Sequence, residues 1–81
     1  MKTILLCEDE SAIREMVAIN LGRNGYRVLE AASGEEALQL FDAHSTEIAI
    51  ALLDVMLPGI DGFTVCERLR RQSDSIGIIM L

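Results

Sequence analysis

Tryptophan is absent from this sequence of 81 residues, which also contains only one tyrosine, two phenylalanines and one proline. Because 51% of the residues are hydrophobic, a disordered chain is excluded and the core must be mainly aliphatic. No hydrophobic run approaches the roughly 18 residues of a membrane span, and the first run is too short for a signal peptide. We therefore expect a soluble, cytoplasmic protein of one domain at most.

Basic residues are also scarce, with 7 Lys and Arg against 13 Asp and Glu, so the formal net charge is −6. Their only cluster is Arg68, Arg70 and Arg71. This balance argues against direct nucleic-acid binding by this segment and favours a cation site, although a merely solvated acidic surface is commoner. The two cysteines, Cys7 and Cys66, lie in separate apolar stretches and are predicted to be buried free thiols.

Short apolar runs alternate with amphipathic segments along the chain, which predicts strands alternating with helices. Strands are expected at residues 3–7, 27–31, 48–53 and 76–81, and helices at 11–24, from 33 onward and at 61–72. The strand at 48–53 is expected to be central and covered on both faces. Alternation of this kind implies a parallel sheet with right-handed crossovers and helices on both sides.

The predicted helices begin at residues that cap backbone N–H groups. Ser11 and Asp61 are expected N-caps, and Ser33 with Glu36 forms a capping box. Gly25 is expected to end the first helix. The side chains expected to face the core are Ile13, Met16, Val17, Asn20 and Leu21, then Ala37, Leu38 and Phe41, then Phe63, Cys66 and Leu69.

Acidic residues follow two of the predicted strands. Glu8, Asp9 and Glu10 come after the first strand, and Asp54 ends the third. Ligands of such sheets bind outside the carboxyl ends of the strands, so Asp9 and Asp54 converge if the two strands are neighbours. A single acid at such a position is more often a cap or a solvated residue, but the pair favours a Mg²⁺ site, with raised carboxylate pKa values without metal. Beside bound Mg²⁺, Asp54 is a candidate nucleophile toward a phosphoryl donor.

These residues resemble a known family. The segments Ile4–Glu10, Ile13–Met16 and Leu52–Gly62 are similar to the receiver domain of two-component response regulators. Within that family, the chain is most similar to transcription regulators whose receiver precedes a winged-helix DNA-binding domain. The resemblance implies a flavodoxin-like, doubly wound parallel sheet with strand order 2-1-3-4. It also implies a sensor histidine kinase as phosphoryl donor, and DNA contact only through an output domain outside this segment.

The resemblance assigns roles to individual residues. Asp54 matches the phosphoacceptor, and Asp9 matches the direct Mg²⁺ ligand. Glu8 matches the acid that acts on the metal through water, and Met56 the position that offers its backbone carbonyl to the metal. Gly62 matches the glycine that opens the third helix.

The resemblance also implies parts that these 81 residues do not include. A receiver has five strand–helix pairs, so residues 1–81 are expected to be a partial domain without the fourth helix, fifth strand and fifth helix. The family's Thr or Ser at the end of the fourth strand would fall at the position after residue 81, and its phosphate-binding Lys lies on the fifth strand. Without that Lys, phosphorylation is expected to be slow or lost. The strand at 76–81 is expected to be an exposed apolar edge, through which a homodimer or a swapped assembly would form.

Two other functions stay open. One is a phosphatase that forms a phospho-aspartate, which is disfavoured because Met56 stands where such enzymes carry a second acid. The other is an interaction module that pairs through its exposed edges and is not phosphorylated. We therefore expect a signalling domain that is not an enzyme.

Overall fold

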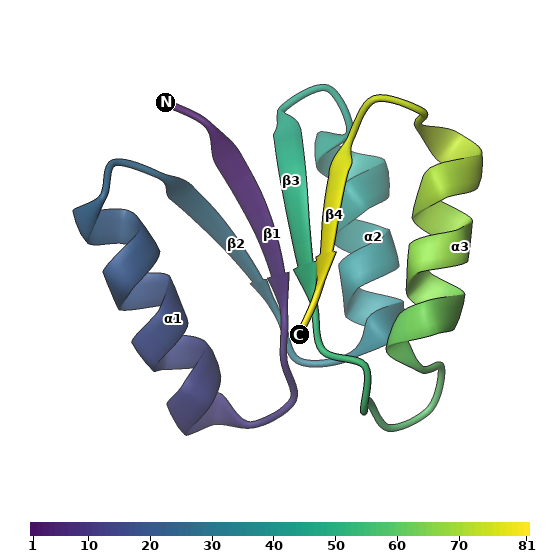
Figure 1. The fold of residues 1–81 in the computed structure, drawn as a ribbon, viewed down its shortest axis with the longest axis horizontal. Coiled ribbons are helices and arrows are strands. Elements are labelled where there is room, and N and C mark those ends of the chain that lie inside the picture. Colours follow the sequence, from purple (N-terminus) through teal and green to yellow (C-terminus); the bar gives the residue numbers. More distant parts are fainter.

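A computed structural model describes residues 1–81 and contains one parallel sheet of four strands with three helices (Figure 1). In chain order the elements are β1 (Thr3–Cys7), α1 (Ser11–Arg23), β2 (Arg27–Ala31), α2 (Gly34–His44), β3 (Ile48–Leu53), α3 (Gly62–Gln72) and β4 (Gly77–Met80). The strands lie in the order β2-β1-β3-β4, and every neighbouring pair is parallel. The predicted flavodoxin-like sheet and its strand order are confirmed. No helix is long and apolar enough to cross a membrane.

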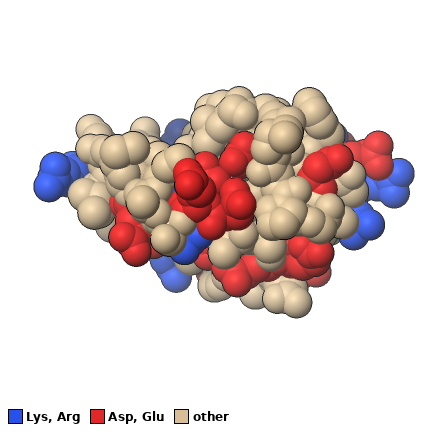
Figure 2. Space-filling model, turned by 90° about the horizontal axis from the view of Figure 1, so that it is seen from below, with Lys and Arg blue, Asp and Glu red and all other residues tan.

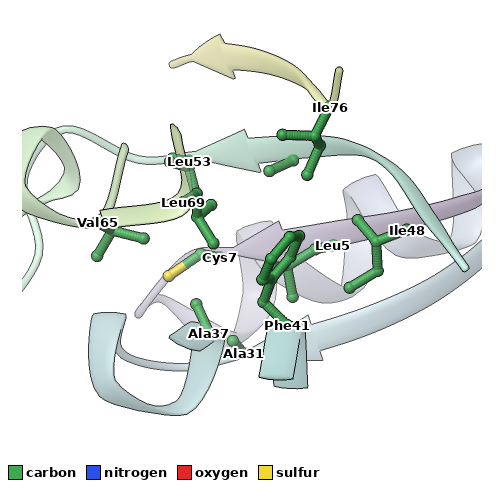
Figure 3. Close-up of a cluster of buried hydrophobic side chains, with 11 residues drawn as sticks. Leu5, Cys7, Ala31, Ala37, Phe41, Ile48, Leu53, Val65, Leu69 and Ile76 are labelled. Atoms are coloured by element: carbon green, nitrogen blue, oxygen red, sulfur yellow. The ribbon is translucent and has the colours of Figure 1, made fainter. Parts of the chain in front are cut away.

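Helices cover the two faces of the sheet unequally. α2 and α3 pack against each other over one face, whereas α1 lies beside β2 and β1 (Figure 1). The main core cluster forms between the sheet and the α2–α3 pair, and Figure 3 shows Phe41 of α2 beside Leu5 of β1. Phe41 is 1% exposed and is among the largest buried side chains. The core is therefore aliphatic apart from this one ring, as the composition predicted.

Two of the predicted helix caps are confirmed. The hydroxyl oxygen of Ser33 accepts a hydrogen bond from the N–H of Glu36 at 3.1 Å, and the Glu36 carboxylate accepts one from Ala32 N–H at 3.1 Å. The carboxylate of Asp61 accepts a hydrogen bond from Thr64 N–H at 2.8 Å. These bonds satisfy N–H groups that have no partner inside the helix, so α2 and α3 begin where the sequence predicts.

The predicted cap of α1 is wrong. Ser11 is the first helical residue, and Glu10 occupies the capping position without a side-chain capping bond. Instead, the Glu8 carboxylate accepts a hydrogen bond from Glu10 N–H at 3.2 Å, and the Glu10 carbonyl accepts one from Arg14 N–H at 2.9 Å. The loop after β1 is thus organised by an acid of the loop itself. The predicted end of α1 is confirmed, since Gly25 has a φ of 87°.

Three predictions about burial need correction. α1 has no buried residue, and Met16, predicted to face the core, is 57% exposed. Because α1 lies over β2 and β1, Ile50 and Leu52 of β3 are only half-buried, so the predicted cover on both faces of that strand is incomplete. Phe63 is 63% exposed, and Val65 faces the core instead.

The last strand is an edge, as predicted, because β4 pairs only with β3. It is shorter than predicted, ending at Met80, and Ile79 is half exposed. The two cysteines are free thiols, also as predicted, although only Cys7 is fully buried and Cys66 is half-buried.

Candidate functional site

The candidate site lies at the carboxyl ends of β1 and β3, which are neighbours in the sheet. Cys7 of β1 pairs with Leu53 of β3, so the residues that follow leave the sheet side by side. The backbone N–H of Asp54 donates to the Cys7 carbonyl at 3.0 Å, which continues the pairing by one residue. The N–H of Glu8 donates to Ala31 at the end of β2, also at 3.0 Å. Strand pairing therefore brings the predicted site residues together, as the sequence required.

The side chains of Glu8, Asp9 and Asp54 converge there. Each contributes a carboxylate oxygen, and these oxygens all lie within 4.8 Å of one another. Glu8 is only 7% exposed, Asp54 is half-buried and Asp9 is exposed. Figure 2, which views the molecule from this end, shows acidic side chains gathered at the centre of the face.

Two hydrogen bonds hold the loop after β3. Oδ1 of Asp54 accepts a hydrogen bond from the N–H of Met56 at 3.1 Å, and Gly62 N–H donates to the Val55 carbonyl at 3.2 Å. The Met56 side chain is exposed and its backbone belongs to the loop after Asp54. The proposed use of its carbonyl toward a metal stays a prediction.

Burial and charge both act on the ionisable groups of the site. Burial raises the pKa of Glu8, and its contacts with Asp54 and Asp9 raise that pKa further, whereas the hydrogen bond from Glu10 N–H lowers it. The predicted direction is confirmed, although burial is the larger cause and charge crowding the smaller. Burial also raises the pKa of the Cys7 thiol to about 12, with a further contribution from Asp54. Cys7 is therefore protonated at neutral pH and is no nucleophile.

The raised pKa of Glu8 predicts that Glu8→Gln stabilises the metal-free protein at neutral pH. At pH values between the unfolded and folded pKa of this carboxyl group, the folded state binds the proton more tightly than the unfolded state. The free energy of unfolding therefore falls as the pH rises through this range. The loss of unfolding free energy is complete above the folded pKa and absent below the unfolded pKa of 4.5. Gln removes the buried charge and keeps an oxygen for Glu10 N–H. We expect a gain of about 0.5–2 kcal/mol in the free energy of unfolding at pH 7.

Urea denaturation at several pH values measures this gain, which is expected to vanish below pH 4.5. Glu67→Gln is a matched control, because the Glu67 side chain is 67% exposed and its pair with Arg71 is a surface one at 3.5 Å. Such a substitution is expected to change stability by less than about 0.5 kcal/mol at any pH. An equal effect of the two substitutions, or a Glu8→Gln variant less stable than the parent at pH 7, would show that the buried charge of Glu8 does not destabilise the folded state.

The donor set fits a small divalent cation. Carboxylate oxygens are the ligands that Mg²⁺ prefers, and two oxygens bound to one Mg²⁺ stand at most about 4 Å apart. The three carboxylate oxygens lie within 4.8 Å of one another, a limit slightly above that span. Contacts with Asp54 and Asp9 add to the larger effect of burial on the pKa of Glu8, and a bound cation would offset the repulsion among the three carboxylates. Glu8, Asp9 and Asp54 are the residues able to hold such an ion.

Two residues beside the cluster were not predicted to act there. A groove next to Asp9 is lined by the loop after β3 and by Phe63, whose exposed ring the sequence had placed in the core. Arg14 reaches the Glu8 carbonyl with its guanidinium at 2.8 Å. The sequence predicts neither position. An arginine on an amphipathic helix is usually solvated, and a phenylalanine there is usually buried.

Comparisons with known proteins agree with this geometry. Residues 4–81 match the family model described as response regulator receiver domain. The transcriptional regulatory protein AfsQ1 of Streptomyces coelicolor is 49% identical over 81 residues, which are the whole of this chain and 35% of AfsQ1. The chain thus spans about a third of the length of this relative.

Solved structures resemble this chain closely as well. The response regulator protein TrrA from Thermotoga maritima, in complex with Mg²⁺-BeF, is 38% identical with a TM-score of 0.91, and the match covers 99% of this chain and 68% of that one. TrrA in complex with histidine kinase ThkA matches with a TM-score of 0.89 and 38% identity, over 99% of this chain and 67% of that one. Both likenesses include the sheet and the loops that carry the acidic cluster.

Proposed function

This chain belongs to the response regulator receiver domain family, and from that premise we propose that Asp54 accepts a phosphoryl group at a Mg²⁺ site formed with Asp9 and Glu8. One observation carries the proposal, namely the convergence of the three carboxylates within 4.8 Å at the ends of two neighbouring strands. The Mg²⁺-BeF complex of TrrA, a protein 38% identical to this chain, supports the same site. The Met56 backbone carbonyl is the proposed further ligand.

The chemistry is a transfer between two nucleophiles. A carboxylate oxygen of Asp54 attacks the phosphorus atom of a phosphohistidine, the P–N bond breaks with its electron pair going to the histidine, and an acyl phosphate forms. Asp54 stands at a strand end, where the hydrogen bond from Met56 N–H to its Oδ1 orients the carboxylate. Bound Mg²⁺ would supply charge neutralisation for the phosphoryl oxygens.

The partner and the output follow from the relatives. TrrA is seen with a histidine kinase, which supports a sensor histidine kinase as the phosphoryl donor for this chain. AfsQ1 is a transcriptional regulatory protein, and residues 1–81 correspond to 35% of it. We propose that this segment is part of a receiver domain, and that its phosphorylation controls a DNA-binding output domain while the segment itself contacts no DNA.

Asp54→Asn is expected to abolish phosphorylation. Prolonged incubation of the 81-residue chain with Mg²⁺ and a small phosphodonor should slowly add one phosphoryl group, detected by intact mass and lost in alkali, and the variant should gain none. Asp61→Asn is the matched control, since Asn caps a helix as well as Asp and the adduct should persist.

Three outcomes separate the candidate functions. A stable adduct on Asp54 supports the receiver, whereas continuous release of phosphate would indicate a phosphatase. Absence of an adduct together with a concentration-dependent oligomer would favour an interaction module pairing through β4, whose Ile79 is half exposed. Sedimentation of the same sample measures the oligomer.

A further inference from the structure

Arg14 is a basic side chain bound directly to the loop that carries the acidic cluster. We propose that Arg14 is a positioning residue, which holds the peptide group between Glu8 and Asp9 and thereby raises the affinity of the site for Mg²⁺. The inference rests on the proposed function, because it concerns the metal of that site. It assigns a role to α1 other than packing, which matters because that helix has no buried residue.

The contacts of Arg14 join two strand ends. Its Nη1 donates to the backbone carbonyl of Glu8 at 2.8 Å, and its Nε lies 3.5 Å from Oε1 of Glu30, the second-last residue of β2. The Arg14 side chain is only 18% exposed, whereas that of Glu30 is 42% exposed. The Arg14 side chain is thus largely buried, and its shorter contact goes to a backbone carbonyl of the loop after β1.

The Glu8 carbonyl sets the orientation of the backbone that enters Asp9. The carbonyl of Glu8 and the N–H of Asp9 belong to one planar peptide group, so a bond that holds the first also sets the orientation of the second. The other side of Glu8 is already held by its N–H bond to Ala31 at 3.0 Å. The peptide group after Asp9 is held as well, because Glu10 N–H donates to the Glu8 carboxylate at 3.2 Å. The backbone is therefore fixed on both sides of Asp9. A hydrogen bond from a charged donor is about twice as strong as a neutral one, which suits this task.

Charge and position make opposite predictions for Mg²⁺. A cation next to the cluster repels Mg²⁺, so if only its charge mattered, removing Arg14 would tighten metal binding. If Arg14 holds the Glu8–Asp9 peptide in place, removing it would weaken binding, because the ligands would no longer be preorganised. The sign of the change therefore distinguishes the two.

The experiment is a Mg²⁺ titration of the 81-residue chain and its variants. Arg14→Met keeps the length of the side chain and should weaken Mg²⁺ binding about 10-fold, the lower end of the effect of residues that orient metal ligands. Arg14→Lys keeps the charge but offers no planar fork to reach both Glu8 and Glu30, so it should also weaken binding. Arg23→Met, at the far end of the same helix, should change the affinity by less than about twofold.

A second measurement needs no metal. The amide chemical shifts of Asp9 and Glu10 should move in metal-free Arg14→Met and stay in Arg23→Met, and thermal unfolding shows whether each variant is folded. A merely stabilising residue would lower the unfolding temperature and leave the Mg²⁺ affinity of the folded protein unchanged.

The outcomes separate this inference from the function beneath it. A parent chain that binds no Mg²⁺ would overturn the proposed function and this inference together. A parent that binds Mg²⁺, with a folded Arg14→Met variant that binds it equally or more tightly, would overturn the role of Arg14 alone. Parent-like affinity in Arg14→Lys would show that the planar fork and its contact with Glu30 are not needed, and would contradict the two-contact geometry proposed for Arg14.

Discussion

Gly62→Ala is expected to destabilise the protein by roughly 3 kcal/mol and to disturb the phosphorylation site at the same time. A Cβ atom on Gly62 would lie 2.1 Å from the carbonyl oxygen of Asp54 and 2.9 Å from Cα of Val55. These are backbone atoms, which cannot turn aside as the end of a flexible side chain can. The loop after β3 and the start of α3 would have to move apart, and the Gly62 N–H bond to the Val55 carbonyl would be lost with them.

Urea denaturation measures the loss of stability, and the phosphodonor assay measures the loss of the Asp54 adduct. Gly22→Ala is the matched control, because a Cβ atom on Gly22 meets nothing within 4 Å. Alanine is favoured over glycine inside a helix, so this control should gain up to about 1 kcal/mol. If Gly62→Ala were as stable as the parent, the close approach of α3 to Asp54 would be incorrect.

The pairing of the strands explains why so much of the fold could be predicted. Residues 3–7 and 48–53 are short apolar runs bounded by charged residues, whereas residues 27–31 include Arg27 and Glu30. Each of the three segments is a strand with the predicted bounds. The alternation with helices then leaves few arrangements, since parallel strands need right-handed crossovers. The acids at the ends of the first and third runs were placed correctly for the same reason. Strand ends in a parallel sheet meet at one edge.

Packing between elements could not be predicted from periodicity alone. The apolar residues of α1 predict a buried face, but how much of a face is buried depends on how far the helix extends over the sheet. α1 lies over β2 and β1, so Met16 is left exposed. For α3, the inward positions follow from where the helix begins. Starting at Gly62, they are Gly62, Val65 and Leu69, and Phe63 is rotated by about 100° from the first of these.

The site shows the same division. The convergence of Asp54 and Asp9 follows from the ends of neighbouring strands, and the predicted pKa rise follows from crowding, although burial of Glu8 proved the larger cause. The Arg14 contact depends on the exact course of the loop after β1, which begins α1 at Ser11 without a side-chain cap. Only the three-dimensional structure reveals such a contact, because the acceptor is a backbone carbonyl and every residue type has one.

The two phenylalanines offer the strongest test of the packing, because the sequence predicts both to face the core and the structure places only one there. Phe41→Ala should lower the free energy of unfolding by about 3–5 kcal/mol, since the ring is 1% exposed and its removal leaves a cavity beside Leu5. Phe63→Ala should change stability by less than about 0.5 kcal/mol, because that ring is 63% exposed. Urea denaturation of the two variants in parallel measures the difference.

The size of the first loss matters for a chain this short. At about 0.05–0.15 kcal/mol per residue, 81 residues provide only about 4–12 kcal/mol of stability in total, so Phe41→Ala removes a large share. At the lower end of that range the variant has a substantial unfolded fraction. Comparable losses in both variants would mean that Phe63 packs inward and that the start of α3 is rotated from its place in the structure. That rotation would also move the Gly62 backbone away from Asp54. The stability of Phe63→Ala therefore tests the same contact as Gly62→Ala, namely the close approach of Gly62 to the Asp54 backbone at the start of α3.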